Sequence, residues 1–455
     1  MALARRAFLQ QSTQGLAAMA LSTLLRSSDS SAGGPRHAGK ARTVIWLFMN
    51  GGPSHIDLFD PKPALAKWDG KPFPGEADAL FPNPGPVMKS PFRFRQYGES
   101  GAWVSEVFPH LARHVDDIAF VCSCTTKAKN HGPALYSINT GSLLMGAPHL
   151  GAWATYGLGS ANEDLPAFVA MYDHRSCPET GVQLWGAGYL PSKYQGVTFR
   201  PGRKPILYVG APKGVSRRAQ RAQLDYLRRL NRRHIGQRTE TSDLEARIAS
   251  FETAFRMQMS VPELTDLSQE TRETRTLYGL DDPRCRYFGT QLLLARRMAE
   301  RGVRFIQIYH GGAVQNWDQH SHLRREHTKL AYETDRPIAG LLADLKRTGL
   351  FGSTLVVWGG EFGRSPTSQD FTGRDHNRRG FTMWMAGGGV RPGVRYGATD
   401  EFGSRAVEDP VSVHDLHATI LHLLGIDHES LIFRFGGRDQ TPTAGLGHVI
   451  RPILA

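Results

Sequence analysis

Apolar runs the length of single strands recur along the chain, and they constrain the fold more than any other feature. The first run covers Thr43 to Met49, and later runs cover Val303 to Tyr309 and Thr354 to Trp358. A strand that is apolar at most positions is typical of a parallel sheet covered on both faces. Stretches with helical spacing of apolar residues lie between the runs. We therefore predict an α/β fold, a three-layer sandwich with a mainly parallel central sheet between helical layers.

Weaker signals place further elements. Ile118 to Val121 and Phe381 to Ala386 have strand composition, and Asn130-His131-Gly132-Pro133 opens a helix that ends near Thr140-Gly141. Helical spacing also appears in four longer stretches, which are Glu106 to Val115, Ser216 to Met259, Arg286 to Glu300 and Val411 to Leu424. The second and third of these predict a largely helical insertion around residues 213–300.

The first 40 residues have the features of an export signal. Arg5-Arg6-Ala7-Phe8-Leu9 is a twin-arginine pattern, followed by the apolar stretch Gly15 to Leu25 and a Ser/Gly-rich run to Gly39. The apolar stretch is too short and too mild for a stable membrane span, so we expect no transmembrane segment. We predict a bacterial export signal and linker at 1–40, a folded domain at 41–455, and a periplasmic or cell-surface location.

The formal net charge of +13 is concentrated in two places. One is the leader, and the other is the stretch from Lys213 to Arg238, which carries seven of its arginines between Arg217 and Arg233. Leu224, Leu227 and Leu230 keep helical spacing there, which favours an amphipathic helix with a solvated basic face. A nucleic-acid or glycan site on this stretch is the alternative. We expect no nucleic acid and favour an anionic ester or sulfated glycan as partner. Four scattered cysteines exclude a disulfide scaffold.

Metal-ligand side chains follow the apolar runs, where α/β proteins place their active sites. Asp318 and His322 lie four residues apart in the loop after Tyr309, and His376 follows in Gly373-Arg374-Asp375-His376. Carboxylate and imidazole are the ligand set of zinc and similar divalent ions. A solvated Asp-x-x-x-His pair is the alternative for such spacing. Among the neighbouring His310, His320 and His327, we expect at least one structural histidine.

Glu361 and Arg364 lie in the Gly-flanked turn directly after Trp358. The glutamate would face the carboxyl edge of the sheet, and the arginine could hold an anionic ester oxygen in bidentate fashion. A structural Glu–Arg ion pair is the alternative. His131 opens its helix beside Gly132-Pro133, where the positive end of the helix dipole favours an anion. It is a candidate metal ligand, acid/base or nucleophile, or a residue that only caps the turn.

From about Val44 to the end, the chain resembles the sulfatase-like family catalogued as domain of unknown function 1501, in the alkaline phosphatase superfamily of metallohydrolases. The motifs that carry the resemblance are Asn50-Gly51-Gly52-Pro53-Ser54-His55-Ile56-Asp57, Asn130-His131-Gly132-Pro133, Ala295-Arg296-Arg297-Met298, Trp317-Asp318-Gln319-His320, Gly360-Glu361-Phe362-Gly363-Arg364, Gly373-Arg374-Asp375-His376 and Asp415-Leu416-His417-Ala418-Thr419-Ile420.

The resemblance implies two metal ions. Asp318, His322 and His376 match the ligands of one site in order and spacing. The second site departs from the superfamily pattern: Asn50 takes the place of an acidic residue, Glu361-Phe362 takes the place of an Asp-His or Asp-Asn pair, and the nucleophile position falls near His131. His55, Asp57 and Glu361 are candidates for rebuilding it. Zinc is the expected metal, with calcium, magnesium or manganese as alternatives.

No cysteine has a proline two residues later, so the formylglycine chemistry of sulfatases is absent. Thr125 and Thr126 lie near the nucleophile position but are displaced from the helix start. A metal-activated water is the most economical nucleophile, because the metal lowers its pKa toward about 7. We therefore expect an exported sulfatase-like metallohydrolase of phosphate or sulfate esters. The alternative is a non-catalytic protein that binds an anionic glycan or other polyanion and retains the fold with a structural metal.

Overall fold

The computed structural model describes residues 37–455 apart from 77, 79–82, 201–204, 207–213, 236–241 and 315. Nearly all of the predicted export signal therefore lies outside the described residues. Within them, no helix is long and apolar enough to cross a membrane.

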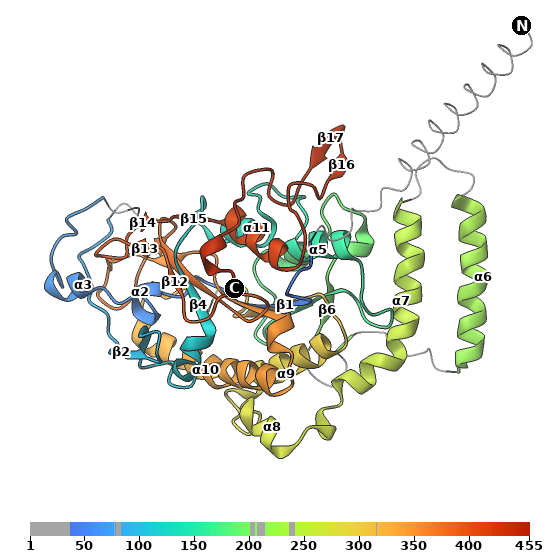
Figure 1. Ribbon diagram of the computed structural model, residues 1–455, viewed down its shortest axis with the longest axis horizontal. Coiled ribbons are helices and arrows are strands. Elements are labelled where there is room, and N and C mark those ends of the chain that lie inside the picture. Colours follow the sequence, from blue (N-terminus) through green and yellow to red (C-terminus); the bar gives the residue numbers. More distant parts are fainter. Residues whose placement is uncertain are drawn as a thin grey trace, which may run out of the picture.

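A nine-stranded sheet forms the centre of the molecule, in the order β12-β4-β11-β8-β1-β7-β5-β6 with β15 paired to β4 (Figure 1). The bounds of its strands are β1 Thr43–Met49, β4 Ile118–Thr125, β5 Phe168–Met171, β6 Val197–Phe199, β7 Phe305–His310, β8 Thr354–Gly359, β11 Phe381–Ala386, β12 Arg395–Tyr396 and β15 Val411–Ser412. Strand β1 lies between β7 and β8 and is parallel to both. Only β11 is antiparallel to its neighbours β4 and β8. The predicted mainly parallel sheet is confirmed.

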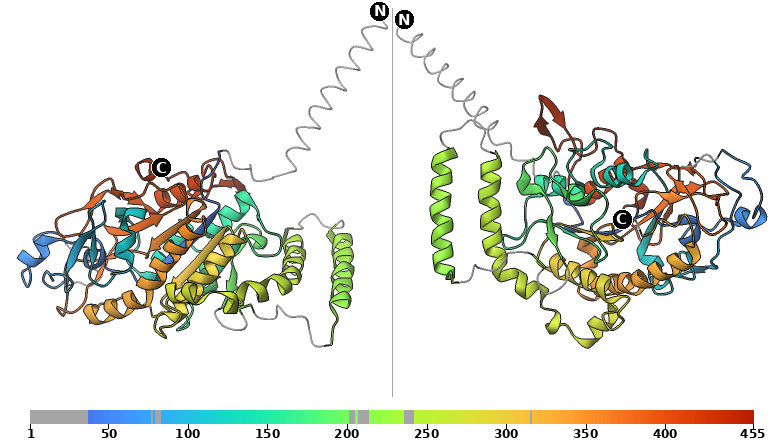
Figure 2. Two further views of the ribbon diagram at one scale, coloured as in Figure 1. Left: turned by 60° about the horizontal axis from the view of Figure 1, so that its bottom comes forward. Right: turned by 180° about the vertical axis from the view of Figure 1, so that it is seen from behind.

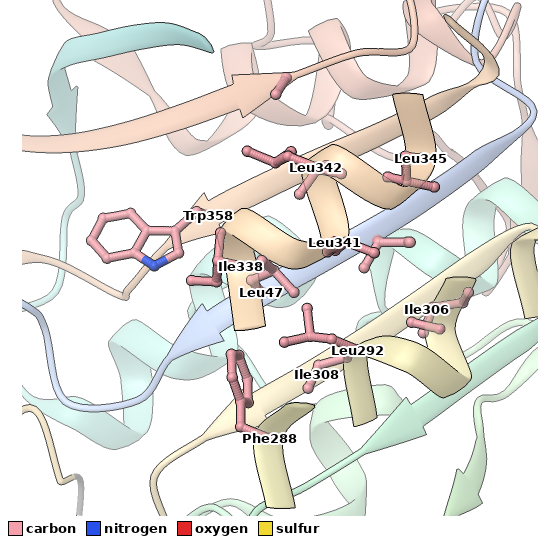
Figure 3. Packing of buried hydrophobic residues seen from close by; sticks show 14 of the residues in the cluster. Leu47, Phe288, Leu292, Ile306, Ile308, Ile338, Leu341, Leu342, Leu345 and Trp358 are labelled. Atoms are coloured by element: carbon pink, nitrogen blue, oxygen red, sulfur yellow. The ribbon is translucent and has the colours of Figure 1, made fainter. Parts of the chain in front are cut away.

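Helices cover both faces of this sheet, as predicted for a three-layer sandwich. In Figure 1, α9 (Arg286–Glu300) and α10 (Leu323–Arg347) lie below the sheet, and α5 (Leu150–Leu158) and α11 (Val413–Leu423) lie above it. Alternate side chains of β1 enter two separate cores: Leu47 packs with the α9 and α10 side, and Trp46 packs with the other side. Figure 3 shows the first core, where Leu47, Ile306 and Ile308 meet leucines and isoleucines of the helices. Burial on both faces explains why β1 is apolar at almost every position.

Two long helices stand beside the sandwich. Helix α6 (Arg217–Ile235) and helix α7 (Ser242–Thr265) project together from the body, with α7 nearer to it (Figures 1 and 2). The short helix α8 (Arg272–Leu277) then leads into α9. The described part of residues 213–300 is largely helical.

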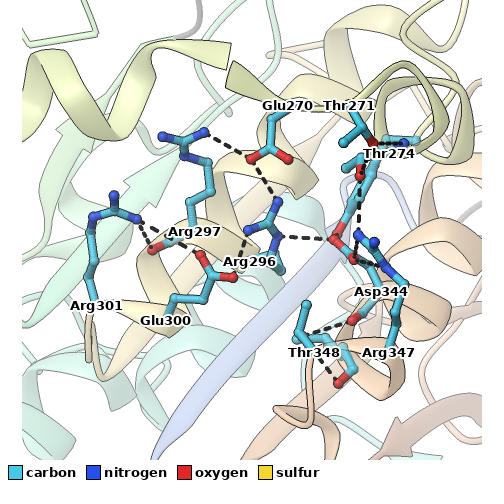
Figure 4. Close-up of polar contacts among 12 residues, drawn as sticks. Glu270, Thr271, Thr274, Arg296, Arg297, Glu300, Arg301, Asp344, Arg347 and Thr348 are labelled. Atoms are coloured by element: carbon cyan, nitrogen blue, oxygen red, sulfur yellow. Dashed lines mark hydrogen bonds and ion pairs between the residues drawn. The ribbon is translucent and has the colours of Figure 1, made fainter. Parts of the chain in front are cut away.

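A buried polar network fixes α9 to the segments before and after it (Figure 4). Arg296 of α9 pairs with Glu270 at 2.8 Å, with Glu300 at 2.7 Å and with the fully buried Asp344 of α10 at 3.0 Å. Arg297 shares the Glu270 carboxylate at 2.9 Å. Charges that leave water need such partners. The Arg296-Arg297 pair of the sequence motif therefore has a structural role.

One predicted helix is wrong. The stretch from Glu106 to Val115 follows strand β3 (Ala102–Ser105), which pairs with β2 (Phe94–Tyr97), and it forms only a 3-10 helix from Leu111 to Asp117. Pro109 explains the difference, because proline inside a helix removes a hydrogen-bond donor and clashes with the preceding turn. The helix at Asn130 is confirmed as α4 (His131–Thr140).

Candidate metal centre

Three neighbouring strands deliver the candidate residues to one edge of the sheet. In the register of β1, Met49 lies beside His310 of β7, and Phe48 lies beside Gly359 of β8. The loops that follow must therefore meet at the carboxyl ends of these strands. A hydrogen bond of 3.0 Å from Trp317 N to Asn50 O joins two of them. The short antiparallel pair β9 (Gly363–Arg364) and β10 (His376–Asn377) brings His376 to the same place.

Asp318 is the centre of the cluster. Its Oδ1 lies 3.1 Å from His376 Nε2, 3.1 Å from His320 Nε2 and 2.6 Å from a guanidinium nitrogen of Arg364. Its Oδ2 lies 3.2 Å from His131 Nε2. Burial opposes ionisation of this carboxyl, but Arg364 first of all, and then the nearby His131 and His320, outweigh burial and hold its pKa far below the usual range. Asp318 is therefore an anion surrounded by nitrogen atoms.

Glu361 binds the Nδ1 side of the His131 ring. The imidazole Nδ1–H donates to Glu361 Oε1 at 2.6 Å, and Glu361 also accepts from the backbone N–H of Gly51 at 2.9 Å. His131 Nε2 is buried and makes no aligned hydrogen bond, and it pairs with Asp318 Oδ2 at 3.2 Å. Burial favours the neutral ring, but the carboxylates of Asp318 and Glu361 raise the pKa of His131 to about 9. Without an ion, the ring is a cation at neutral pH.

His376 has the tautomer of a metal ligand. Its Nδ1 lies 2.6 Å from the carbonyl oxygen of Lys129, which can only accept, so Nδ1 carries the proton. Nε2 is then left with a lone pair that faces Asp318 and lies 3.0 Å from His320 Nε2. Burial, Arg364 and His131 lower the pKa of His376 despite the nearby Asp318. A neutral imidazole oriented by a carbonyl is the usual state of a ligating histidine.

Two overlapping groups of three side chains could each hold an ion. The ligand atoms of His131, Asp318 and His376 all lie within 4.8 Å of one another, as do those of His320, Asp375 and His376. Mixed imidazole and carboxylate donors suit zinc and related divalent ions. His131 Nε2, once it has lost its proton, and the lone pair of His376 Nε2 both face Asp318 and fit such an ion.

Arg364 lies behind this cluster. Its guanidinium is fully buried and donates to the carbonyls of Gly51, of Gly52 at 2.8 Å and of Arg374 at 3.2 Å, besides pairing with Asp318. This placement ties three loops together and fixes the Asp318 carboxylate. The Arg364 guanidinium therefore has no exposed surface with which to bind an anion from solvent.

The cluster opens into a hollow of about 500 Å³. Its lining consists of Asn130, His131, Gly132, Pro133, Glu179, Ala313, Asp318, His320 and His376. The start of α4 forms one wall, so the positive end of a helix dipole faces the hollow. No residue in this described lining carries a hydroxyl or thiol group.

The structure brings together His131, Asp318, Glu361, Arg364 and His376 of the predicted residues, and it places the other four elsewhere. His322 is exposed, has φ 54° and borders a separate hollow of about 720 Å³. His55 is buried against the carbonyl of Gly403 at 3.0 Å, and burial lowers its pKa to about 4. Asn50 is buried next to Gly51, the residue whose backbone N–H binds Glu361. Its side-chain amide donates to Gly312 O at 2.6 Å. Asp57 pairs with Arg374 and is not part of the cluster.

His320 and Asp375 join the cluster without having been predicted as ligands. The only signal for His320 is its place in the histidine-rich loop after β7, because its spacing from Asp318 matches no helical face. His310 and His327 are structural, as expected for at least one of the three. His310 accepts from the indole N–H of Trp317 at 3.0 Å, and His327 accepts from Ser54 N at 3.1 Å.

Comparisons with known proteins identify a family. A family model described as "Protein of unknown function (DUF1501)" matches residues 41–454, which confirms the resemblance carried by the motifs. No curated protein matches the sequence.

Several solved structures are similar at a low level. They include a phosphonate monoester hydrolase from Silicibacter pomeroyi (TM-score 0.40, 12% identity, 90% of this chain and 76% of that chain). The sulfatase PsFucS1 from Pseudoalteromonas sp. has a TM-score of 0.38 and 12% identity over 90% of this chain and 71% of that chain. The alkaline phosphatase of the Antarctic bacterium TAB5 has a TM-score of 0.37 and 10% identity over 85% of this chain and 99% of that chain. With scores this low, we transfer no activity from them.

Proposed function

Since the chain belongs to the DUF1501 family of proteins of unknown function, we propose from its own site that it is a metal-dependent hydrolase of phosphate or sulfate esters. The observation that carries the proposal is the convergence of His131, Asp318 and His376, with ligand atoms within 4.8 Å of one another, at the floor of an open hollow. Partly buried donors of this kind at the carboxyl edge of a parallel sheet support an active site more than a structural one.

The first ion would be held by His131, Asp318 and His376, and a second by His320, Asp375 and His376. A divalent ion, zinc before calcium, magnesium or manganese, would supply Lewis-acid chemistry by drawing charge from an ester oxygen and lowering the pKa of water. Both groups share His376, so one fully ligated ion at a time is the simplest occupancy.

The remaining residues position the site. Glu361 fixes the Nδ1–H tautomer of His131 and directs Nε2 toward Asp318. Arg364 fixes the Asp318 carboxylate from the buried side. The first turn of α4 provides backbone N–H groups and a positive dipole end for the anionic oxygens of an ester. The described lining contains no hydroxyl or thiol, so water is the nucleophile that the proposal requires.

A second candidate is a binding protein that retains a structural ion without catalysis. The burial of Arg364 favours the binding protein over the hydrolase. Its guanidinium already binds backbone carbonyls and Asp318, so it cannot bind an anionic ester. In that case an anionic glycan or other polyanion would be held by α4 and the ion alone.

The location is part of the proposal. The twin-arginine pattern at Arg5-Arg6 supports export to the periplasm or cell surface. This route carries folded proteins, so the ion could be acquired before export. The partner would be a small-molecule or glycan anionic ester.

A panel of aryl phosphate, phosphodiester and sulfate esters tests the two candidates. The chain is stripped of metal, reloaded with zinc, calcium, magnesium or manganese, and compared with Asp318→Ala. Metal-dependent turnover that Asp318→Ala abolishes supports the hydrolase. If reloaded chain binds metal but turns over no ester while retaining affinity for a sulfated glycan, the binding protein is the better account.

A further inference from the structure

Helix α6 is the most basic element of the described structure and is not used by the proposed site. It carries seven arginines and one acidic residue, Asp225. Its packing partner is α7: Arg221 pairs with Glu252 at 2.7 Å, and its guanidinium lies over the Phe255 ring at 5.1 Å. Figures 1 and 2 show α6 on the far side of α7 from the sandwich. One whole face of α6 therefore points away from the body.

Large apolar side chains are exposed along α6. Tyr226, Leu227 and Leu230 are 55%, 42% and 43% exposed, whereas Leu224 is half-buried. Tyr226 and Leu230 are four residues apart and so lie on one side of the helix. The exposed Ala219 and Ala222 extend the same stripe toward the N-terminal end.

Arginines border this apolar stripe. Arg229 lies three residues after Tyr226 and projects along the edge of the stripe. Arg233 lies seven residues after Tyr226 and continues the line of the stripe at its C-terminal end. Arg218 precedes Ala222 by four residues and continues the same edge. All three side chains are exposed. The outward side of α6 thus combines an apolar stripe with a row of positive charges.

This combination fits a bilayer surface that contains anionic lipid. An amphipathic helix with arginines beside exposed leucine and tyrosine side chains lies in the headgroup region, with its apolar stripe in the acyl boundary and its cations on lipid phosphates. We propose that α6 docks the chain peripherally on membranes rich in anionic phospholipid.

Two other occupants fit less well. A second copy of the chain would bring two strongly positive faces together, which like-charge repulsion opposes. A sulfated polysaccharide would pair with the arginines but would leave Tyr226, Leu227 and Leu230 in water. The membrane proposal is independent of the hydrolase proposal, because it uses no residue of the metal centre.

Vesicle binding by the full chain tests the proposal. Sedimentation is measured with phosphatidylcholine vesicles that contain or lack phosphatidylglycerol. Tyr226→Ser/Leu230→Ser removes the apolar stripe, and Arg229→Glu/Arg233→Glu reverses two charges. The matched control is Arg272→Glu/Arg275→Glu, which reverses two exposed charges on α8. Residues 1–40 are unchanged in every variant and so cannot cause a difference between variants.

We expect the parent chain and the α8 control to bind phosphatidylglycerol vesicles alike, and both α6 variants to lose at least ~tenfold in partition coefficient. Brominated acyl chains should quench Tyr226→Trp beyond the quenching of the parent's own tryptophans. The proposal is overturned if the parent does not prefer vesicles with phosphatidylglycerol. It is also overturned if the apolar variant binds like the parent while heparin displaces both, which would indicate a polyanion site.

Discussion

Glu361 Oε1 lies 2.6 Å from His131 Nδ1, so a fully buried carboxylate orients the imidazole that faces Asp318. The glutamate comes from the loop after β8 and the histidine from the start of α4, and the contact joins segments 230 positions apart in sequence. The backbone N–H of Gly51 holds the same carboxylate from the β1 loop. Glu361 thus acts through His131 and has no place in the hollow itself.

Replacing Glu361 with glutamine should weaken the centre without unfolding it. The amide keeps the shape of the carboxylate but removes its charge, so the pKa of His131 should fall from about 9 toward 6.5 in metal-free protein. Metal affinity should drop roughly 10–100-fold, as for other partners of ligating histidines. NMR titration of His131 and metal-binding isotherms measure the two effects. Glu326→Gln, at a partly exposed position of α10, is the control. Equal behaviour of the two variants would contradict this role of Glu361.

The Asp57–Arg374 ion pair should dominate local stability. Both side chains are fully buried, 2.6 Å apart, and Arg374 also holds the carbonyl of Met88 at 3.0 Å. Asp57→Ala leaves the guanidinium without its counter-ion and should lower the free energy of unfolding by about 3–5 kcal/mol. Asp69→Ala breaks the more exposed pair with Lys89 and should lower it by about 1 kcal/mol or less. Urea denaturation measures the free energy of unfolding of both variants. Losses of similar size would show that burial of an ion pair does not determine how much it stabilises the fold.

Much of the sheet could be predicted from the sequence, because strands that are buried on both faces are apolar at nearly every position. Strand β1 and strand β11 have the predicted bounds, and β8 is longer by one residue, Gly359. The antiparallel direction of β11 could not be predicted, because an interior strand is equally apolar in either direction. The predicted helix from Glu106 is wrong because Pro109 interrupts a stretch whose apolar residues otherwise keep helical spacing.

Buried histidines should make the fold acid-sensitive, and His417 offers a clean test. It is fully buried on α11, donates to Ile138 O at 2.8 Å, and burial lowers its pKa to about 4. The folded state thus favours the neutral ring. The contribution of this preference to the free energy of unfolding is fully present above pH 6.5 and is lost as the pH falls through 4. The loss should reach about 3 kcal/mol relative to His417→Gln, which keeps a donor for Ile138 but does not titrate.

Unfolding free energies of metal-free protein at pH 7, 6, 5 and 4 give this difference. Other buried histidines, such as His327, titrate in both proteins and cancel in the comparison. A difference that stays constant with pH would mean that His417 is not neutral in the fold.

Only some of the candidate metal ligands could be predicted from the sequence. Asp318 and His376 follow strands, and their convergence can be deduced from the parallel register. The choice between His320 and His322 cannot, because the four-residue spacing of Asp318 and His322 has meaning only on a helix. In the structure α10 begins at Leu323, and His322 takes a left-handed conformation before it. This backbone places His320, and not His322, beside Asp318.

The metal content of the purified chain and of three variants shows whether Asp318 and His376 bind an ion. We expect about one divalent ion per chain in the wild type and in His322→Ala, with loss of the ion in His376→Ala and Asp318→Ala. Circular dichroism should confirm that all four proteins are folded. A wild-type chain that binds no ion after incubation with zinc, calcium, magnesium or manganese would rule out this metal centre, and loss of the ion in His322→Ala would rule out this ligand set.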